Sequence, residues 1–205
     1  MATHEPWLAA STPLILASAS PRRRDLLAQI GVMPLEIIPA DIDEAVGRRE
    51  LPRAYATRMA VQKCQTIVGA HPGAVVLAAD TVVAVGRRIL PKTENRADAE
   101  HCLRLLSGRA HKVIGGIALA LPGRPALVRV VTSRVSFKVL SEHEIKAYLD
   151  TAEWQGKAGG YAIQGRAAAF IQAISGSYSN VVGLSLHESY QLLTGAGFRL
   201  GVPVP

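Results

Sequence analysis

The first indication of fold and function lies in residues 14–24, which have the sequence LILASASPRRR. The first four are apolar and typical of a short buried strand, and the serines and proline that follow end it. Further on, leucine and isoleucine recur at helical spacing until Gly31, which predicts a helix over Pro21–Ile30. Ser20 suits the N-cap of this helix and Pro21 its first position. We therefore expect a strand, a tight turn and a helix in succession.

Arg22, Arg23 and Arg24 fall in the first turn of that predicted helix. The start of a helix carries partial positive charge, so each cation placed there costs about 0.3–1 kcal/mol. A sequence selected only for stability would carry Asp or Glu instead. Free backbone N–H groups, the helix dipole and clustered guanidinium groups all favour a bound anion, most often phosphate. We expect a phosphate site here, and the alternative is a solvent-exposed basic patch without a ligand.

The composition is that of a globular protein that binds an anion. Of 205 residues, 49% are hydrophobic and 19% are charged, which is enough for a sizeable core. The net charge of +7 favours an anionic partner such as a nucleotide, a nucleic acid or an acidic membrane. Only 5% of residues are aromatic, so a stacking platform for nucleic acid is weakly supported. The length suits one domain or two small lobes that share a sheet, and we expect a loose leader over 1–12 and a single domain over 13–205.

The cysteine and hydropathy patterns indicate a soluble cytoplasmic protein. Cys64 and Cys102 both fall in predicted helices, and a reduced compartment suits them better than a disulfide. The apolar run that begins at Leu14 does not resemble a signal peptide, because Glu5 precedes it and the arginines follow it. No stretch approaches eighteen apolar residues without a charge, so no membrane span is expected.

Helices and strands alternate along the chain, with hairpins interspersed, which predicts an α/β protein with a mixed sheet. Besides the strand and helix already described, the periodicity predicts strands near 35–39, 74–79, 82–85, 111–121, 126–138 and 167–174, and helices over 52–68, 96–107, 141–151 and 186–196.

Two carboxylates are candidate metal ligands. Asp80 interrupts an otherwise apolar run, Val75–Val83, and a buried carboxylate without a partner is costly. Asp80 is therefore expected to face a metal, a cation or a water-filled cleft. Glu44, in an acidic cluster, would complete a site for Mg²⁺ or Mn²⁺, which suit phosphate substrates. The alternatives are a structural Asp80 bonded to backbone and a solvated Glu44.

Lysines and a glycine-rich segment supply further candidates. Lys63 lies on or beside the apolar stripe of a predicted helix, where it could also merely extend to solvent, and Lys92 follows a turn. Residues 156–165, GKAGGYAIQG, permit close backbone approach to a ligand, with Lys157 and Gln164 as polar groups. A plain turn is the alternative, and the segment is not a Walker A loop. The six histidines form no zinc motif and no nucleophile elbow occurs.

Taken in their order along the chain, these sequence features closely resemble those of the Maf family of nucleoside triphosphate pyrophosphatases. The matching blocks are residues 16–23, 79–83, 105–108, 156–165 and 176–184. The resemblance implies hydrolysis between the α and β phosphates, which gives a monophosphate and pyrophosphate with a divalent cation. It also implies a fold similar to that of inosine triphosphatases, an elongated mixed β-sheet with flanking helices and two lobes around a nucleotide cleft. Dimers are common in the family, so a homodimer is a further expectation.

The resemblance also implies roles for individual residues. Asp80 would be the proton acceptor, and Glu44 would assist in metal binding or catalysis. The residues expected to hold the triphosphate are Ser18, Arg22, Arg23, Lys63, Lys92 and Lys157, and those associated with substrate choice are Arg22, Thr81 and Gln164.

The form of the glycine-rich loop that contains Lys157 resembles the branch of the family acting on dTTP and UTP. The alternatives are the branch acting on 7-methyl-GTP and a non-catalytic regulator of cell division that binds nucleic acid in the same basic cleft. Thr93, Ser185 and His187 depart from the family pattern, and none of them is a proposed catalytic residue.

Overall fold

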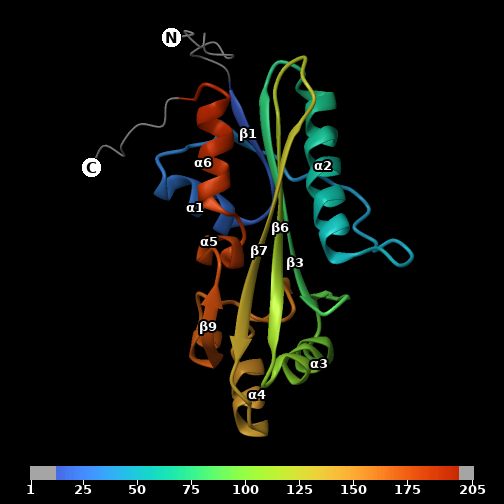
Figure 1. The fold of residues 1–205 in the computed structure, drawn as a ribbon, viewed down its shortest axis with the longest axis vertical. Coiled ribbons are helices and arrows are strands. Elements are labelled where there is room, and N and C mark those ends of the chain that lie inside the picture. The colour runs from blue at the N-terminus through green and yellow to red at the C-terminus, as the bar shows by residue number, and fades with distance from the viewer. Residues whose placement is uncertain (1–12, 199–205) are drawn as a thin grey trace.

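A seven-stranded mixed sheet runs along the molecule (Figure 1). The computed structural model describes residues 13–198. The strands are paired in the order β2-β1-β3-β6-β7-β9, with β4 paired to β3, and only the β2-β1-β3 pairings are parallel. Their bounds are β1 Leu14–Ala17, β2 Glu36–Ile37, β3 Val75–Val85, β4 Arg88–Leu90, β6 Ala110–Ala120, β7 Leu127–Phe137 and β9 Ile171–Ser175.

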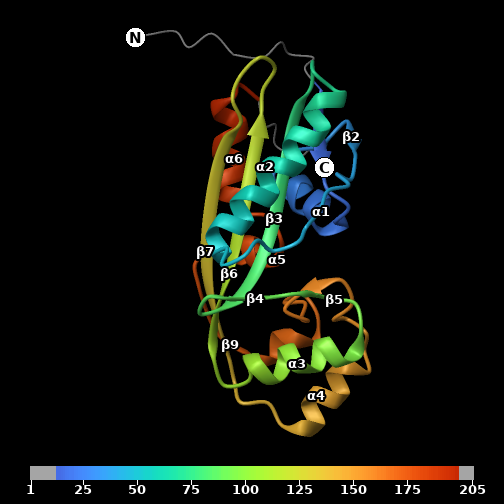
Figure 2. The ribbon, with the colours of Figure 1, turned by 90° about the vertical axis from the view of Figure 1, so that its right-hand side faces the viewer.

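Helices cover both faces of the sheet, and they fall into two groups, one in each half of the molecule. In one half α2 lies on one face and α1, α5 and α6 lie on the other, whereas α3 and α4 belong to the opposite half (Figures 1 and 2). The second half also contains a small two-stranded sheet of β5 and β8. The bounds are α1 Pro21–Gln29, α2 Pro52–Ala70, α3 Arg96–Leu106, α4 Glu142–Leu149, α5 Tyr178–Val182, α6 Leu186–Gly195, β5 Lys92–Thr93 and β8 Lys157–Ala158.

Strand β3 is buried on both faces, and its side-chain alternation decides which way the candidate residues point. Side chains on successive residues of a strand point to opposite faces. Those that pack with α2 are Val76, Ala78, Val82 and Ala84. Those that join the core on the opposite face are Val75, Leu77, Ala79 and Val83. The same alternation directs Asp80 to the α2 face and Thr81 to the face of α1 and α5.

Asp80 and Thr81 lie at a gap in the pairing of β3. One edge of β3 is paired with β6 throughout 76–84. The other edge is paired with β1 over 75–78 and with β4 over 83–85, so within the described chain residues 79–82 have no strand beside them on that edge. The chain turns away from β1 into α1 at this point, as the loops at the carboxyl ends of parallel strands commonly do. The gap leaves room for a ligand beside two polar residues.

Gly115 and Gly116 of β6 allow helices to approach the sheet behind this gap. They are paired with Thr81 and Asp80 respectively. A Cβ atom on Gly116 would lie 2.1 Å from the carbonyl oxygen of Ala56 in α2, and one on Gly115 would lie 2.1 Å from Oδ1 of Asn180 in α5. Only glycine fits at such distances. The two glycines therefore set how closely α2 and α5 pack over the candidate site.

Most expected elements are confirmed, and one expected strand begins too early. The second half of the strand predicted over 167–174 is confirmed as part of β9, Ile171–Ser175, but its first half is wrong, because residues Arg166–Phe170 form a 3₁₀ helix. The backbone N–H of Arg166 donates to Glu153 Oε2 at 2.8 Å, a long-range contact that fixes the start of this helix. Ser20 is the N-cap of α1 as expected, but its side chain makes no capping hydrogen bond.

Helix α5 was not predicted, because its five residues lie in a glycine- and serine-rich segment without helical periodicity. The side chain of Ser177 caps it, accepting from the Asn180 N–H at 3.1 Å. The expected leader, 1–12, lies outside the described residues. None of the helices within 13–198 has both the length and the apolar composition that a membrane span requires.

Replacing Gly116 by alanine should lower the free energy of unfolding by about 1–3 kcal/mol, because α2 must move away from the sheet. Gly69→Ala is the matched control, since a Cβ on Gly69 of α2 meets nothing within 4 Å. Alanine there should stabilise the helix by about 0.5–1 kcal/mol. Urea unfolding measures both variants. Equal stabilities for the two alanine variants would show that close packing at Gly116 does not matter.

Candidate active site

A pocket of about 360 Å³ opens between the two halves of the molecule. One wall is formed by the turn between β1 and α1, and another by the glycine-rich segment that follows β8. The gap in β3 and the loop between α5 and α6 complete it. All ten residues singled out from the sequence line this pocket, namely Ser18, Arg22, Arg23, Glu44, Lys63, Asp80, Thr81, Lys92, Lys157 and Gln164.

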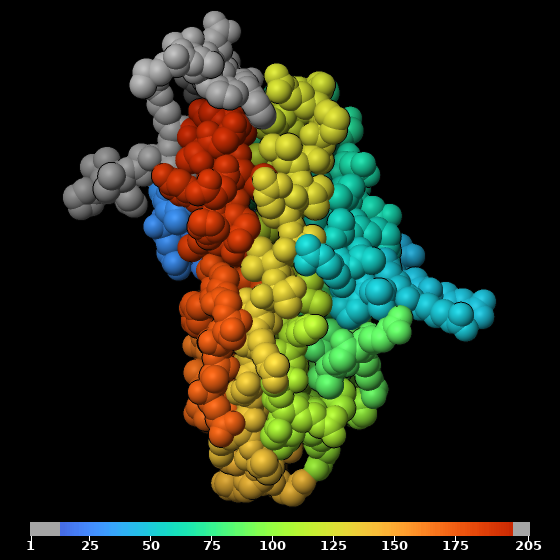
Figure 3. Space-filling view, in the orientation of Figure 1, coloured from blue at the N-terminus to red at the C-terminus, as the bar shows by residue number. Residues whose placement is uncertain are grey.

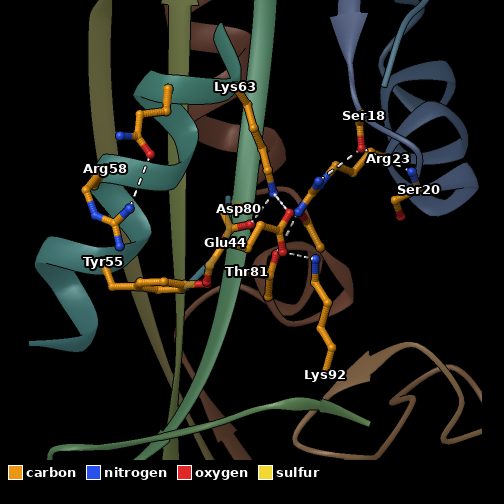
Figure 4. Close-up of polar contacts among 12 residues, drawn as sticks. Ser18, Ser20, Arg23, Glu44, Tyr55, Arg58, Lys63, Asp80, Thr81 and Lys92 are labelled. Carbon is orange, nitrogen blue, oxygen red and sulfur yellow. Dashed lines mark hydrogen bonds and ion pairs between the residues drawn. The ribbon is translucent and has the colours of Figure 1, made fainter. Parts of the chain in front are cut away.

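Two carboxylates and two ammonium groups form a continuous chain in the pocket (Figure 4). Nζ of Lys63 lies 2.7 Å from Oδ1 of Asp80 and 2.7 Å from Oε1 of Glu44. The other carboxylate oxygen of Glu44 accepts a hydrogen bond from Lys92. The four residues come from β3, α2, β5 and the segment before α2. Residues separated widely in sequence thus meet as one charge-balanced group.

Burial explains why this chain of charges is ordered. The exposed fraction of Asp80 is 3% and that of Lys63 is 7%. Lys63 belongs to the buried stripe of α2, whose other members are Pro52, Tyr55, Ala56, Met59, Ala60, Cys64 and Ile67. Charges removed from water are tolerated only when they are paired and hydrogen-bonded. The ammonium of Lys63 therefore has to meet Asp80, and Asp80 has to meet Lys63.

The surrounding charges keep Glu44 ionised. Burial raises the pKa of its carboxyl group, but hydrogen bonds from Lys63 and Lys92 and their positive charges outweigh burial and lower that pKa to about 2. A negative group is thus maintained at physiological pH in a half-exposed position at the pocket.

Arg23 connects three segments of the pocket wall. Its Nε donates to the carbonyl oxygen of Gly183 at 2.9 Å, Nη1 to Oγ of Ser18 at 3.0 Å and Nη2 to Oγ1 of Thr81 at 3.2 Å. Thr81 also donates to Gly183 at 3.2 Å. Burial lowers the pKa of Arg23, while the negative charge of Asp80 opposes that effect. A guanidinium group has five N–H bonds, so two remain for a ligand.

Arg22 and Lys157 place further positive charge at the pocket. Nε of Arg22 is buried and has no hydrogen-bond partner among the described residues. Burial lowers the pKa of Arg22. The pKa of Lys157 is lowered by burial and by the positive charge of Arg22. Arg24, in contrast, is exposed and forms an ion pair with Asp25. The arginine cluster is therefore divided between the pocket and the solvent.

Hydrogen bonds with buried side chains anchor the glycine-rich segment to the core. The Tyr161 hydroxyl and Nε2 of His111 are hydrogen-bonded at 2.8 Å, and the Ala162 N–H donates to the Tyr148 hydroxyl at 3.1 Å. Burial lowers the pKa of His111 to about 4, so it is neutral at physiological pH. Sequence reasoning missed these supporting residues, because a histidine in a predicted strand gives no sign of its partner.

Gly159 shows why this segment is rich in glycine. Its φ is +70°, a conformation that L side chains rarely adopt, and a Cβ there would lie 2.8 Å from Cγ1 of Val83. The segment therefore packs directly on β3 at Val83. Gln164, at the end of the segment, is exposed and faces the pocket.

The three departures from the family pattern leave the pocket intact. Thr93 is fully buried, and its hydroxyl donates to the Trp154 carbonyl at 2.7 Å, which ties β5 to the chain before β8. Ser185 precedes α6 as its N-cap residue, and His187 is exposed on that helix. Helix α6 forms in spite of both substitutions.

The carboxylates of Glu44 and Asp80 are the oxygen donors that could hold a divalent cation. Within residues 13–198, no group of three or more His, Cys, Asp or Glu residues could surround a metal ion. However, Mg²⁺ commonly binds through one or two carboxylates, with substrate phosphates and water as the other ligands. Two hard oxygen donors that already converge on one cation, the Lys63 ammonium, fit such a site.

The low pKa of Glu44 predicts a pH-dependent contribution to stability. A carboxylate whose pKa is lowered by folding stabilises the folded state above its unfolded pKa, and this contribution is lost as the pH falls through the folded pKa. Glu44→Gln should therefore be less stable than wild type above about pH 4.5, with the difference vanishing towards about pH 2. Urea unfolding between about pH 6 and pH 3 measures this difference. A difference that stays constant over this range would contradict the assignment.

Comparison with known proteins places the chain in a family. Residues 13–196 match the Maf-like protein family. A dTTP/UTP pyrophosphatase of Rhodospirillum rubrum is 59% identical over 191 residues, 93% of this chain and 91% of that protein. One of Caulobacter vibrioides is 55% identical over 192 residues, 94% of this chain and 100% of that protein.

A solved structure supports the expected architecture. A HAM1 protein from Coxiella burnetii has a TM-score of 0.50 and 16% identity, and the match covers 90% of this chain and 100% of that one. At this identity the likeness concerns the fold alone, and it confirms the long mixed sheet with flanking helices. The resemblance inferred from the sequence is also confirmed, and the chain belongs to the Maf family.

Proposed function

We propose that this protein hydrolyses dTTP and UTP between the α and β phosphates and releases a nucleoside monophosphate and pyrophosphate. The observation that carries the proposal is the chain Asp80–Lys63–Glu44–Lys92 at a pocket that also contains Arg22. Relatives that are 55–59% identical over more than nine-tenths of this chain are named dTTP/UTP pyrophosphatases. The reaction would remove surplus or modified nucleotides in the cytoplasm.

The cationic groups of the pocket suit a triphosphate. Arg22 and Lys157 lower the electrostatic energy of a polyanion placed near them, and they repel each other until one binds. Lys92 and the two free N–H bonds of Arg23 add donors from other directions, and Ser18 adds a hydroxyl group. Guanidinium and ammonium groups in a pocket form strong charge-assisted hydrogen bonds to phosphate.

Glu44 and Asp80 would hold Mg²⁺ or Mn²⁺, which when bound neutralises phosphate charge and activates water. Asp80 would accept the proton from the attacking water, since its carboxylate is buried beside the gap in β3. Lys63 orients that carboxylate by its hydrogen bond to Oδ1 and stays available to stabilise charge that develops on the phosphate.

Base selection would come from residues on two sides of the pocket. The Thr81 hydroxyl is engaged with Arg23 and Gly183, so a change at Thr81 would also reorient Arg23. Gln164 presents an amide that both donates and accepts hydrogen bonds, as recognition of a pyrimidine edge requires. These groups support a preference for dTTP and UTP.

A nucleotide panel with Mg²⁺ or Mn²⁺, assayed for pyrophosphate and orthophosphate, tests the reaction, the base and the metal together. We expect pyrophosphate from dTTP and UTP in preference to 7-methyl-GTP. Asp80→Asn should lower kcat by about 10²–10⁴-fold, the usual contribution of a general base. Asp150→Asn, a change at an exposed ion pair with Arg96, should have full activity.

Three results would contradict the proposal. One is the release of orthophosphate alone, and another is full activity of Asp80→Asn. The third is the absence of hydrolysis together with steeply salt-dependent nucleic-acid binding that survives Asp80→Asn, which would favour the regulator of cell division.

A further inference from the structure

Glu44 lies on a segment that has no helix or strand of its own. Residues 38–51 connect β2 to α2 without regular structure, and the part nearest α2 projects from the body of the molecule (Figure 3). An unsupported loop would hold a carboxylate loosely, because each residue fixed in place costs about 1–2 kcal/mol of conformational entropy. The position of Glu44 at the pocket therefore requires contacts that order this segment.

Two side chains of α2, Tyr55 and Arg58, supply those contacts, and Figure 4 shows both on the same helix as Lys63. The hydroxyl of Tyr55 donates to the backbone oxygen of Glu44 at 2.8 Å. Nη2 of Arg58 donates to the backbone oxygen of Ala45, the next residue, at 2.9 Å. Two successive carbonyl groups are thus held by one helix. Neither Tyr55 nor Arg58 lines the pocket.

Arg58 is itself fixed by Glu50 at the far end of the same segment. Its Nε and Nη2 donate to the two carboxylate oxygens of Glu50 at 2.8 and 2.7 Å. Oε2 of Glu50 also accepts from the Gly47 N–H at 2.8 Å. The guanidinium carbon lies 5.4 Å from the centre of the Tyr55 ring, within cation–π range. The group ties residues 44–50 to the first two turns of α2.

We propose that Tyr55 and Arg58 are positioning residues that act through Glu44, holding its backbone so that its carboxylate meets Lys63 and Lys92. This inference rests on the proposed function, in which Glu44 takes part, and it names the residues that fix the position of Glu44. The ring of Tyr55 packs with Met59 and Val82, so it belongs to the core. Its hydroxyl group is the part of Tyr55 that contacts Glu44 directly.

Tyr55→Phe keeps the ring and removes the hydroxyl group. We expect kcat/KM for dTTP to fall about 3- to 10-fold, the usual effect of one lost hydrogen bond. Arg58→Lys keeps a charge near Glu50 but replaces the planar fork of donors by one compact ammonium group, which does not match the positions of the two carboxylate oxygens and the carbonyl, so a comparable loss is expected. Tyr190→Phe, at an exposed tyrosine of α6, and Arg104→Lys, in the exposed network of α3, are the matched controls and should have wild-type kinetics.

The decisive experiment combines these changes with Glu44→Gln. If Tyr55 acts through Glu44, Tyr55→Phe should cause no further loss of kcat/KM in the Glu44→Gln background, and the same holds for Arg58→Lys. A merely structural role would give the same loss in both backgrounds. Circular dichroism and thermal unfolding identify any variant that fails to fold. If a variant at Tyr55 or Arg58 does not fold, the kinetics of the variant at the other of these two residues decide the inference.

The outcomes separate this inference from the proposed function. A wild-type protein that releases no pyrophosphate contradicts the proposed function. The positioning role alone is overturned by a different result. In that case the wild type is active and Glu44→Gln is impaired, but Tyr55→Phe and Arg58→Lys either have full activity or lose kcat/KM additively with Glu44→Gln.

Discussion

The ammonium group of Lys63 has to lie between the carboxylates of Asp80 and Glu44, and much of the structure serves that requirement. Lys63 and Asp80 are almost fully buried, so neither can be solvated and each needs the other. Their contact requires α2 to lie close to β3 and its neighbour β6. Gly116, paired with Asp80, permits this approach because a side chain there would collide with the backbone of α2.

A second polar network occupies the opposite side of the same gap in β3. Thr81 points to the other face of the strand and joins Arg23, Ser18 and Gly183. The two networks differ in chemistry: one pairs carboxylates with ammonium groups, and the other places a buried guanidinium among neutral oxygens. The proposed hydrolytic centre and the proposed anion-binding wall therefore lie on adjacent residues of one strand. This proximity supports the proposal that a triphosphate spans them.

Local sequence patterns predicted those site residues that are unfavourable for stability at their position. Asp80 was identifiable because it interrupts an apolar strand, and the arginines because they stand at a helix start, where cations are unfavourable. The difference between Arg23, which matches the family motif, and Arg24, which was expected to face solvent, followed from the family resemblance and not from these local patterns. Arg23 donates to Thr81, 58 residues away, and to Gly183, 160 residues away, so its burial depends on tertiary structure.

Other parts of the site carry almost no local signal. Lys63 and Glu44 were candidates with ordinary alternatives, a lysine that extends to solvent and a solvated carboxylate, and only the fold shows that the two meet. The spacing of Tyr55 and Arg58 is ordinary for an amphipathic helix. Their proposed positioning role depends on the path of residues 44–50, which the sequence does not reveal. The wrong start of the strand predicted over 167–174 has a similar cause, since the first backbone N–H of the 3₁₀ helix donates to Glu153, 13 residues earlier in the chain. Sequence patterns thus located the site better than they assigned its contacts.

The central claim is that the Glu44–Lys63–Asp80 group is where the nucleotide reacts. The most direct test is a crystal structure with Mn²⁺ and a non-hydrolysable dTTP analogue, with the manganese located by anomalous scattering. The account predicts a manganese peak against the carboxylates of Glu44 and Asp80, with the α-phosphorus facing Asp80. A nucleotide bound with its phosphates away from this group, or manganese held by other residues, would contradict it.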